Sequence, residues 1–214
     1  RTPLAVLKTQ VQSARRGDLP PAQALHEIED TVDRATQLAN QMLALARVEQ
    51  LRQQGALPVT RLDAVLRDVA LDLSPLIAQG DLDFGIDTQP AAIRAHDWML
   101  RELCRNLLHN AIRHAPPGSE LGVTLNVDGA QARLTIADAG PGIDDELAAR
   151  LFEPFSAGDV RKGSGLGLAI CQDIVQALGG SLALTNRHQG ARVRGLDAVV
   201  RLPLAGRDGA QSPP

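Results

Sequence analysis

The apolar positions of the first 46 residues recur at alternating spacings of three and four. Leu4, Leu7, Val11 and Ala14 keep this spacing up to residues 17–21, Gly-Asp-Leu-Pro-Pro, which are typical of a turn. The spacing then resumes at Leu25, Ile28, Val32, Ala35, Ala39, Met42 and Ala46. A mean period of about 3.5 residues favours the seam of a supercoiled bundle. We therefore expect an antiparallel helical hairpin over residues 1–55 that is half of a dimeric four-helix bundle.

The two expected arms of this hairpin differ in length. Folding back at the turn places Arg1 opposite roughly position 37, which leaves Met42, Leu45 and Ala46 without a partner. We expect that the first helix is longer in a parent protein of which this sequence is a piece.

Beyond Gly55 and Pro58 the pattern changes to alternating strands and helices, which predicts a second domain over residues 56–205 and a disordered tail at 206–214. Asp128-Gly129 predicts a hairpin turn. A helix is expected to be N-capped near Asp97 and to end at Pro116 and Pro117. The expected strands are 59–62, 82–87, 92–95, 121–127, 132–136, 181–186 and 196–202, and the expected helices are 63–78, 97–115 and 166–178. This order predicts an α+β fold in which helices cover one face of a mixed sheet.

The amino-acid composition and net charge argue against some classes of function. The 214 residues are 44% hydrophobic with three Phe, one Trp and no Tyr, so the core must be aliphatic. The net charge of −3, without a dense basic run, argues against nucleic-acid binding. No apolar run approaches the roughly 18 residues of a membrane span. Cys104 and Cys171 lack metal-ligand spacing, and we expect both to be inert core thiols.

The first candidate site follows a predicted strand and reads Asp138-Ala139-Gly140-Pro141-Gly142. A carboxylate only accepts hydrogen bonds, so Asp138 suits the exocyclic amine of adenine and would repel the carbonyl of guanine. The alternative is an aspartate that merely caps the turn before Ile143.

The second candidate is a pair of asparagines, Asn106 and Asn110, which are one helical turn apart on one face. Amide oxygens are suitable ligands for Mg²⁺, and Arg113 on nearly the same face suits a phosphate. His114 borders this face, whereas His109 is more simply a solvated histidine. In the alternative interpretation both asparagines lie in solvent while the apolar face of the helix is buried.

The third candidate is the run Gly163-Ser164-Gly165-Leu166-Gly167-Leu168, which opens a predicted helix. Free amides and the helix dipole favour an anion there. The spacing fits neither the dinucleotide motif nor a P-loop. Phe152 and Phe155 precede the polar segment 156–162, and this order suits the hinge of a lid that would present Arg161 and Lys162 to phosphates or simply to water.

Together these segments resemble a bacterial two-component sensor histidine kinase. Residues 106–115 resemble its N box, 138–142 its G1 box, 151–155 its F box and 163–168 its G2 box, and residues 1–4 resemble the end of its H box. The resemblance implies a dimerisation and phosphotransfer hairpin followed by a Bergerat-type ATP-binding domain. It implies ATP and Mg²⁺ as cofactors, with Asn106 and Asn110 on the metal. The implied nucleotide contacts are Asn106, Asn110, Arg113, His114, Asp138, Gly140, Gly142, Ile143, Phe155, Lys162, Gly163, Ser164, Gly165, Leu166, Gly167 and Leu168.

The resemblance also implies a reaction and partners. A histidine takes the γ-phosphoryl group of ATP and passes it to an aspartate of a response regulator, while Thr2 matches a threonine that assists dephosphorylation of that regulator. The phosphoacceptor would lie three residues before Arg1, and His26 is no substitute because no Arg-Thr-Pro-Leu follows it. We expect residues 1–214 to bind ATP analogues without phosphorylating themselves. We expect the parent to be a homodimeric inner-membrane protein with this part in the cytoplasm, attached to the membrane only through segments outside this sequence.

Besides the missing histidine, two departures and two alternatives accompany the resemblance. The lid is short, and the last glycine box is reduced to Gly190 and Gly195. One alternative is an ATPase of the same fold, in which Glu102 would have to act as general base because Asn106 stands where such enzymes carry a glutamate. The other is a docking module with a vestigial nucleotide pocket.

Overall fold

A computed structural model describes residues 2–17, 20–25, 27–28, 31–32, 57–144, 151–152, 167–190 and 192–206. In the N-terminal part, helix α1 spans Thr2–Arg16, and Gly17 follows it with a φ of +76°. The described residues between 21 and 32 are also helical, and the hydroxyl of Thr31 donates to the carbonyl of Glu27. The start of the predicted helical hairpin is therefore confirmed in the described residues. The predicted seam beyond Val32 and the tail 207–214 lie outside the described residues.

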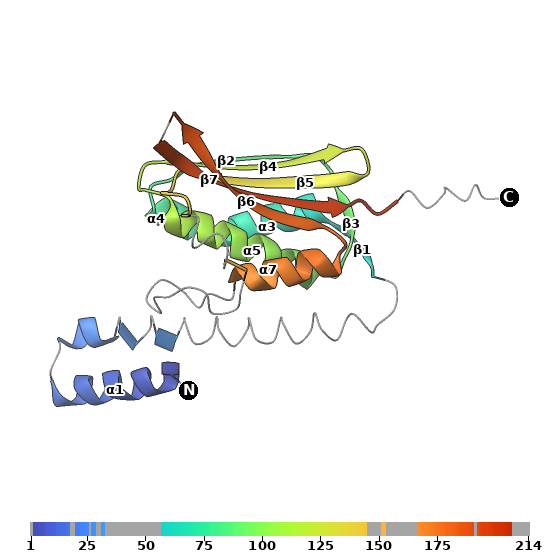
Figure 1. Cartoon of the computed structure of the whole chain (residues 1–214). Helices are drawn as coiled ribbons and strands as arrows, with labels where there is room; N and C mark the ends of the chain where they lie inside the picture. Colours follow the sequence, from blue (N-terminus) through green and yellow to red (C-terminus); the bar gives the residue numbers. More distant parts are fainter. Residues whose placement is uncertain are drawn as a thin grey trace.

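A five-stranded mixed sheet forms the body of the second part, in the order β2-β4-β5-β7-β6 (Figure 1). Its strands are β2 (Asp83–Thr88), β4 (Glu120–Asp128), β5 (Gln131–Asp138), β6 (Ser181–Gln189) and β7 (Arg192–Pro203). Only the pair β2 and β4 is parallel among these neighbours; the others are antiparallel. Strands β1 (Val59–Arg61) and β3 (Ala92–Arg94) form a separate antiparallel pair.

The predicted turn at Asp128-Gly129 is confirmed. Asp128 pairs with Gln131, so the loop between β4 and β5 has two residues, and Gly129 takes a φ of +57°. Glycine is suited to this left-handed position of a tight hairpin.

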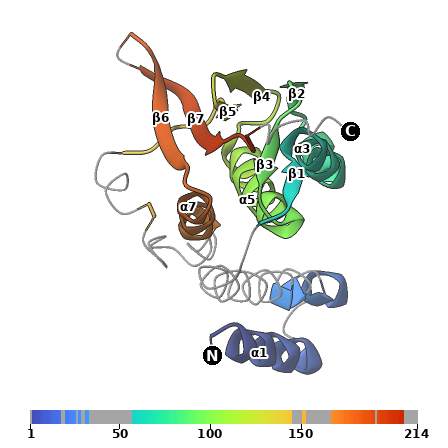
Figure 2. The ribbon, with the colours of Figure 1, turned by 90° about the vertical axis from the view of Figure 1, so that its right-hand side faces the viewer.

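Helices cover one face of the five-stranded sheet, as predicted (Figure 1). They are α3 (Leu62–Asp72), α4 (Ser74–Gln79), α5 (Asp97–His114) and α7 (Gly167–Ala177). Figure 2 views three of them nearly along their axes and shows α5 between α7 and α3. Among the described residues, none of the helices has both the length and the apolar character needed to cross a membrane.

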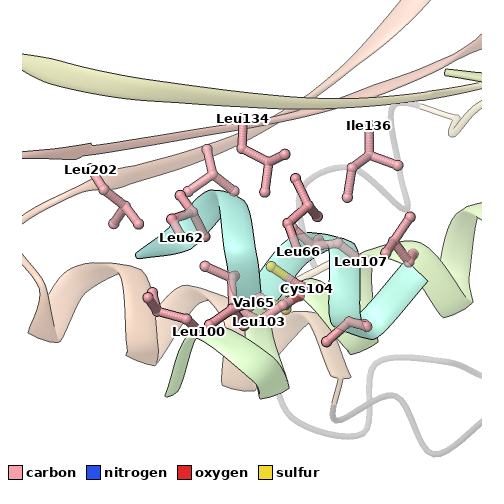
Figure 3. Packing of buried hydrophobic residues seen from close by; sticks show 14 of the residues in the cluster. Leu62, Val65, Leu66, Leu100, Leu103, Cys104, Leu107, Leu134, Ile136 and Leu202 are labelled. Carbon is pink, nitrogen blue, oxygen red and sulfur yellow. Dashed lines mark hydrogen bonds between the residues drawn. The ribbon is translucent and has the colours of Figure 1, made fainter. Parts of the chain in front are cut away.

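The core lies between the sheet and these helices. In Figure 3, Leu134, Ile136 and Leu202 point from the strands toward leucines of α3 and α5, among them Leu66 and Leu103. The alternating residues Leu121, Val123 and Leu125 of β4 and Ala132, Leu134 and Ile136 of β5 are all buried, as their period of two predicts. Val127, at the end of β4, is 38% exposed instead.

Both cysteines belong to this core, as predicted. Cys104 of α5 and Cys171 of α7 are free and buried. Burial raises the pKa of the Cys104 thiol to about 12 and raises that of Cys171 as well. Thiols with such pKa values are protonated and unreactive at neutral pH.

One local prediction was wrong. The single helix expected over 63–78 is two helices, because Pro75 has no N–H to continue the first one and instead occupies the first turn of α4. The N-cap of α5 lies next to Asp97, in agreement with the prediction: it is His96, which makes no side-chain cap bond, while the Asp97 carboxylate accepts from Nε of Arg101 at 2.8 Å. Strands β6 and β7 are also longer than predicted at their hairpin ends.

Asp63 ties the first turn of α3 to the loop before β3. Its side chain is 2% exposed, its Oδ1 accepts from the backbone N–H of Ala91 at 3.1 Å, and its two oxygens accept from Arg61 at 2.8 and 2.7 Å. The hydrogen bond from Arg61 lowers the pKa of this carboxyl against the opposing effect of burial.

We expect Asp63→Ala to lower the free energy of unfolding by about 1–3 kcal/mol, because it leaves the Ala91 N–H buried without an acceptor. Asp68→Ala is the control: its carboxylate is 57% exposed and pairs with Arg101 at the surface. Since the folded-state pKa of Asp63 lies below the unfolded one, its contribution is present at neutral pH and is lost as the pH falls through the folded-state value. Urea unfolding of both variants at several pH values measures this, and equal losses at pH 7 would contradict it.

Candidate functional site

Asp138 is the last residue of β5 and is 5% exposed. Its Oδ1 accepts from the backbone N–H of Gly140 at 2.7 Å, while its main-chain carbonyl accepts from the Arg187 guanidinium at 2.5 Å. The carboxylate is therefore held in one orientation at the edge of the covered face of the sheet.

Burial raises the pKa of Asp138, against the lowering effects of the Gly140 N–H and of His114 and Arg187 nearby. A desolvated carboxylate of this kind gains from a ligand that brings a hydrogen-bond donor.

At Gly140 the loop after Asp138 packs closely against the end of α5. A Cβ at this position would lie 2.8 Å from Asp138 Oδ1 and 2.8 Å from the carbonyl oxygen of His114, so only glycine fits. The close contact places the loop after β5 directly against the last turn of α5.

Gly142 and Ile143 continue the loop toward β6. Gly142 has a φ of +74°, and a Cβ there would lie 2.5 Å from Asn186 Oδ1 and 2.6 Å from Val193. The Asn186 side chain bonds both backbone groups of Ile143: its Oδ1 accepts from the N–H at 2.9 Å and its Nδ2 donates to the carbonyl at 2.6 Å.

Asn106 lies four residues from Asn110 on α5 and is 6% exposed. Its Nδ2 donates to Glu102 Oε1 at 2.9 Å, and its Oδ1 would lie 3.2 Å from a Cβ at Gly167. The amide oxygen of Asn106 thus faces the first residue of α7. The interpretation in which both asparagines are solvated is wrong for Asn106, because it is buried.

Asn110 lies on α5 between the residue that contacts Gly167, which is Asn106, and the residue that contacts Gly140, which is His114. It is one helical turn, about 6 Å, from Asn106 beside Gly167 and about as far from His114 beside Gly140. Asn110 is half-buried, and within the described part of the chain its amide has no hydrogen-bond partner. No described partner therefore keeps the amide oxygen of Asn110 from a ligand.

Three further polar residues lie at this end of α5. Arg113 and His114 are exposed, in the last turn of the helix. His109 is half-buried rather than solvated, and burial, followed by the charge of Arg113, lowers its pKa. Arg113 thus places a permanent positive charge at this end of α5.

The remaining predicted residues are only partly described. Leu168 is half-buried and packs against the core, as does Phe152. Thr2 begins α1, but its side chain is outside the description. The other predicted contacts also lie outside it, namely Phe155, Lys162, Gly163, Ser164, Gly165 and Leu166, together with Arg161. Among the described residues, no group of three or more His, Cys, Asp or Glu is arranged to hold a metal.

The sequence did not predict that Asn186 and Arg187 of β6 bond the loop after β5. It also did not predict that Gly195 lies against Asp138. A Cβ at Gly195 would lie 2.0 Å from the Asp138 carbonyl oxygen and 2.5 Å from the Arg187 guanidinium. One signal was available: an asparagine within an apolar strand pattern, at position 186, is unfavourable unless its amide has a specific partner.

Comparisons with known proteins identify the family of this chain. The family described as histidine kinase-, DNA gyrase B-, and HSP90-like ATPase matches residues 97–206, more than half of the chain. The His Kinase A (phospho-acceptor) domain matches residues 1–51. The chain belongs to the sensor histidine kinases. The match to the phospho-acceptor domain distinguishes this kinase from the DNA gyrase B-like and HSP90-like ATPases that the first description also names.

The sensor protein QseC of Escherichia coli K12 is 34% identical to this kinase over 197 residues, which cover 89% of this chain and 43% of QseC. The chain thus spans less than half of the length of this relative. The structure of the cytoplasmic segment of QseC matches with a TM-score of 0.56 at 27% identity, covering 81% of this chain and 95% of that one.

Two other solved structures match over nearly the whole chain. The Acinetobacter baumannii histidine kinase AdeS has a TM-score of 0.76 at 25% identity and covers 95% of this chain and 96% of its own. Histidine kinase ThkA, in complex with the response regulator protein TrrA, has a TM-score of 0.73 and covers 98% of this chain and 60% of its own. At 19% identity ThkA supports the fold alone. The predicted α+β architecture with a Bergerat-type sandwich is confirmed by these neighbours.

Proposed function

We propose that this kinase binds Mg-ATP against α5 and directs its γ-phosphoryl group to a histidine. The observation that carries the proposal is that α5 contacts both glycine segments, Gly140 at His114 and Gly167 at Asn106. Asn110 lies between the two contacts. A nucleotide laid along this face reaches from a base subsite at one glycine segment to a phosphate subsite at the other.

The base subsite is formed by Asp138. Its carboxylate accepts from the exocyclic amine of adenine, and the bond to the Gly140 N–H keeps it oriented for this role. Guanine presents a carbonyl oxygen at the same place and is rejected. The buried surroundings strengthen both the attraction and the rejection.

The phosphate subsite lies at the start of α7. Gly167 leaves room for the buried Asn106 amide, and the N-terminal amides of the 11-residue helix favour an anion. Asn110 and Asn106 present neutral oxygen ligands, which fit Mg²⁺ bound mainly through phosphates and water. A bound Mg²⁺ would neutralise phosphate charge during transfer. Arg113 adds a cation at the exposed end of the same helix.

The reaction proposed is phosphoryl transfer governed by positioning. An imidazole nitrogen forms the new bond to the γ-phosphorus, the bond from that phosphorus to the β,γ-bridging oxygen breaks, and ADP leaves. An aspartate carboxylate of a response regulator then takes the phosphoryl group from the histidine. In the family the first acceptor precedes Arg-Thr-Pro-Leu by three positions, outside residues 1–214.

The hairpin is the proposed dimerisation and regulator-docking element. The match of residues 1–51 to the phospho-acceptor domain supports a homodimer through residues 1–55. It also supports docking of a regulator at the same hairpin, because the phosphoryl group passes from the acceptor histidine to the regulator. Thr2 would assist dephosphorylation of that regulator. The match to the cytoplasmic segment of QseC supports a cytoplasmic place for this part of an inner-membrane protein.

Calorimetry on the 214-residue protein tests the proposal directly. We expect ATP to bind, Mg²⁺ to tighten the binding, and GTP to bind at least about tenfold more weakly, since a hydrogen bond to a charged group contributes about 1.5–3 kcal/mol. Heat of binding that does not depend on Mg²⁺ would favour a vestigial pocket, and none at millimolar ATP would overturn the proposal. Incubation of the same protein alone with γ-labelled ATP should leave no stable label on it.

A further inference from the structure

Two consecutive residues of β6 hold the two ends of the loop that carries the base subsite. Asn186 bonds the N–H and the carbonyl of Ile143, at 2.9 and 2.6 Å. Arg187 donates to the carbonyl of Asp138 at 2.5 Å, and its Nε lies 3.3 Å from Asp197 of β7. The loop 138–143 is thus attached at its start and at its end to a strand more than 40 residues away.

We propose that Asn186 is a positioning residue for adenine recognition, which holds the Asp138–Ile143 loop in its base-binding conformation by bonding the Ile143 backbone, with Arg187 holding the other end. This inference rests on the proposed function, because it assigns what keeps the adenine subsite in place. In this role the Asn186 side chain acts on the loop and does not itself contact the nucleotide.

The loop needs such a restraint because of its composition. Gly140 and Gly142 both belong to it, and glycine loses more backbone entropy on ordering than any other residue. Asp138 itself is held by the pairing of β5 with β7. An unrestrained loop would place the backbone after it in many arrangements, and with it the Gly140 N–H that orients the Asp138 carboxylate. A side-chain amide matches a backbone N–H and carbonyl at the same residue, since it offers one acceptor and one donor side by side.

The packing around Gly142 shows that the loop and β6 are fitted to one another. A Cβ at Gly142 would overlap with Asn186 and with Val193 of β7, at 2.5 and 2.6 Å. On the other side, Gly195 allows the Asp138 carbonyl to approach Arg187. Both glycines serve the approach of loop to strand, so neither needs to contact a ligand for its identity to matter.

The first experiment measures the attachment without nucleotide. Hydrogen exchange of the Ile143 amide, followed by NMR in the ligand-free protein, should be at least about tenfold faster in Asn186→Ala, because the N–H loses its acceptor. Gly142→Ala should act in the same way by displacing Asn186. Thr185→Ala controls for β6, since Thr185 is exposed and its side chain alternates with that of Asn186. Gly129→Ala controls for the left-handed backbone, since the φ of Gly129 is +57° and an added Cβ would meet no neighbouring heavy atom within 4 Å.

The second experiment measures recognition in the same four variants. ADP and IDP differ at position 6 of the purine, where IDP carries an oxygen in place of the amino group. Asn186→Ala and Gly142→Ala should reduce the ratio of ADP to IDP affinity about tenfold, whereas both controls keep the wild-type ratio. Melting temperatures identify any variant that fails to fold.

The outcomes separate the two proposals. Unchanged Ile143 exchange in Asn186→Ala overturns the attachment, and faster exchange with an unchanged ADP to IDP ratio overturns its role in recognition. A wild-type protein that binds no ADP overturns the proposed function itself, and the positioning role with it, before any variant is compared. Faster exchange together with a reduced ratio in both variants supports the inference.

Discussion

Asp138→Asn is expected to weaken ADP binding about 10–100-fold, the range of a lost hydrogen bond to a charged group. Asp138 Oδ1 accepts from the Gly140 N–H, and adenine would bring a second donor to this carboxylate. Asparagine offers one acceptor and one donor in place of two acceptors, so either the loop N–H or the adenine amine then faces another N–H. Calorimetric titration with ADP measures the loss.

A loss of folding should not be the cause of the weaker ADP binding of Asp138→Asn. Because burial raises the pKa of Asp138, ionising it opposes folding as the pH rises from the unfolded-state pKa through the folded-state one. Replacing the carboxylate by a neutral amide removes that unfavourable contribution, so the melting temperature of Asp138→Asn at neutral pH should equal or exceed that of the wild type.

The same raised pKa predicts a pH dependence of binding. As the pH falls, the Asp138 carboxyl takes up a proton at a higher pH than an ordinary aspartate does, and the protonated oxygen no longer accepts from adenine. Affinity for ADP should therefore fall with acidification in the wild type and stay flat over the same range in Asp138→Asn. If the ADP affinities of the wild type and of Asp138→Asn changed with pH in the same way, or if Asp138→Asn kept the full affinity, other residues would have to recognise adenine.

Asn110→Ala is the second change with a large expected effect. It removes the half-buried amide that has no partner within the described residues, so it should leave the fold intact. We expect the affinity of the ATP-bound protein for Mg²⁺ to fall about 10–100-fold, the range found when groups around a metal site are removed. Titrating MgCl₂ into the protein with ATP, and repeating the ATP titration in EDTA, measures this.

Two comparisons make the Asn110 result specific. Asn126→Ala removes the same side chain from an exposed position on β4 and should change nothing. Asn106→Ala should lose stability as well as affinity, because Asn106 is buried and bonded to Glu102. If Asn110→Ala kept the wild-type tightening by Mg²⁺ while its EDTA affinity fell, Asn110 would contact the nucleotide and not the metal.

Much of the architecture could be predicted because its signals are local. The period of two in β4 and β5 identified their buried residues, and the apolar face of residues 97–115 identified the helix that became the centre of the core. The break at Pro75 was missed because the apolar spacing continues across it, although the proline ends α3. Here the chemistry of a single backbone nitrogen decides the structure.

The candidate site divides in the same way. Asp138, the asparagine pair and the glycine runs were found from residue type and short spacing. Asn186 was not, because its amide acts on a backbone 43 residues away, and no spacing rule connects two such positions. Gly195 was noticed only as the remnant of a glycine box, whereas its contact with the Asp138 carbonyl explains why it is glycine.

The order of residues along the chain determined which side chains are present, which share a helix face or a side of a strand, and therefore which kind of ligand they suit. The tertiary structure alone decided that Asp138 is buried with a raised pKa, that the oxygen of Asn106 faces Gly167, and that β6 holds the loop after β5. The physical reason is distance. Periodicity and turn preference act over a few residues, whereas desolvation and close packing are produced by neighbours from segments far apart in the sequence.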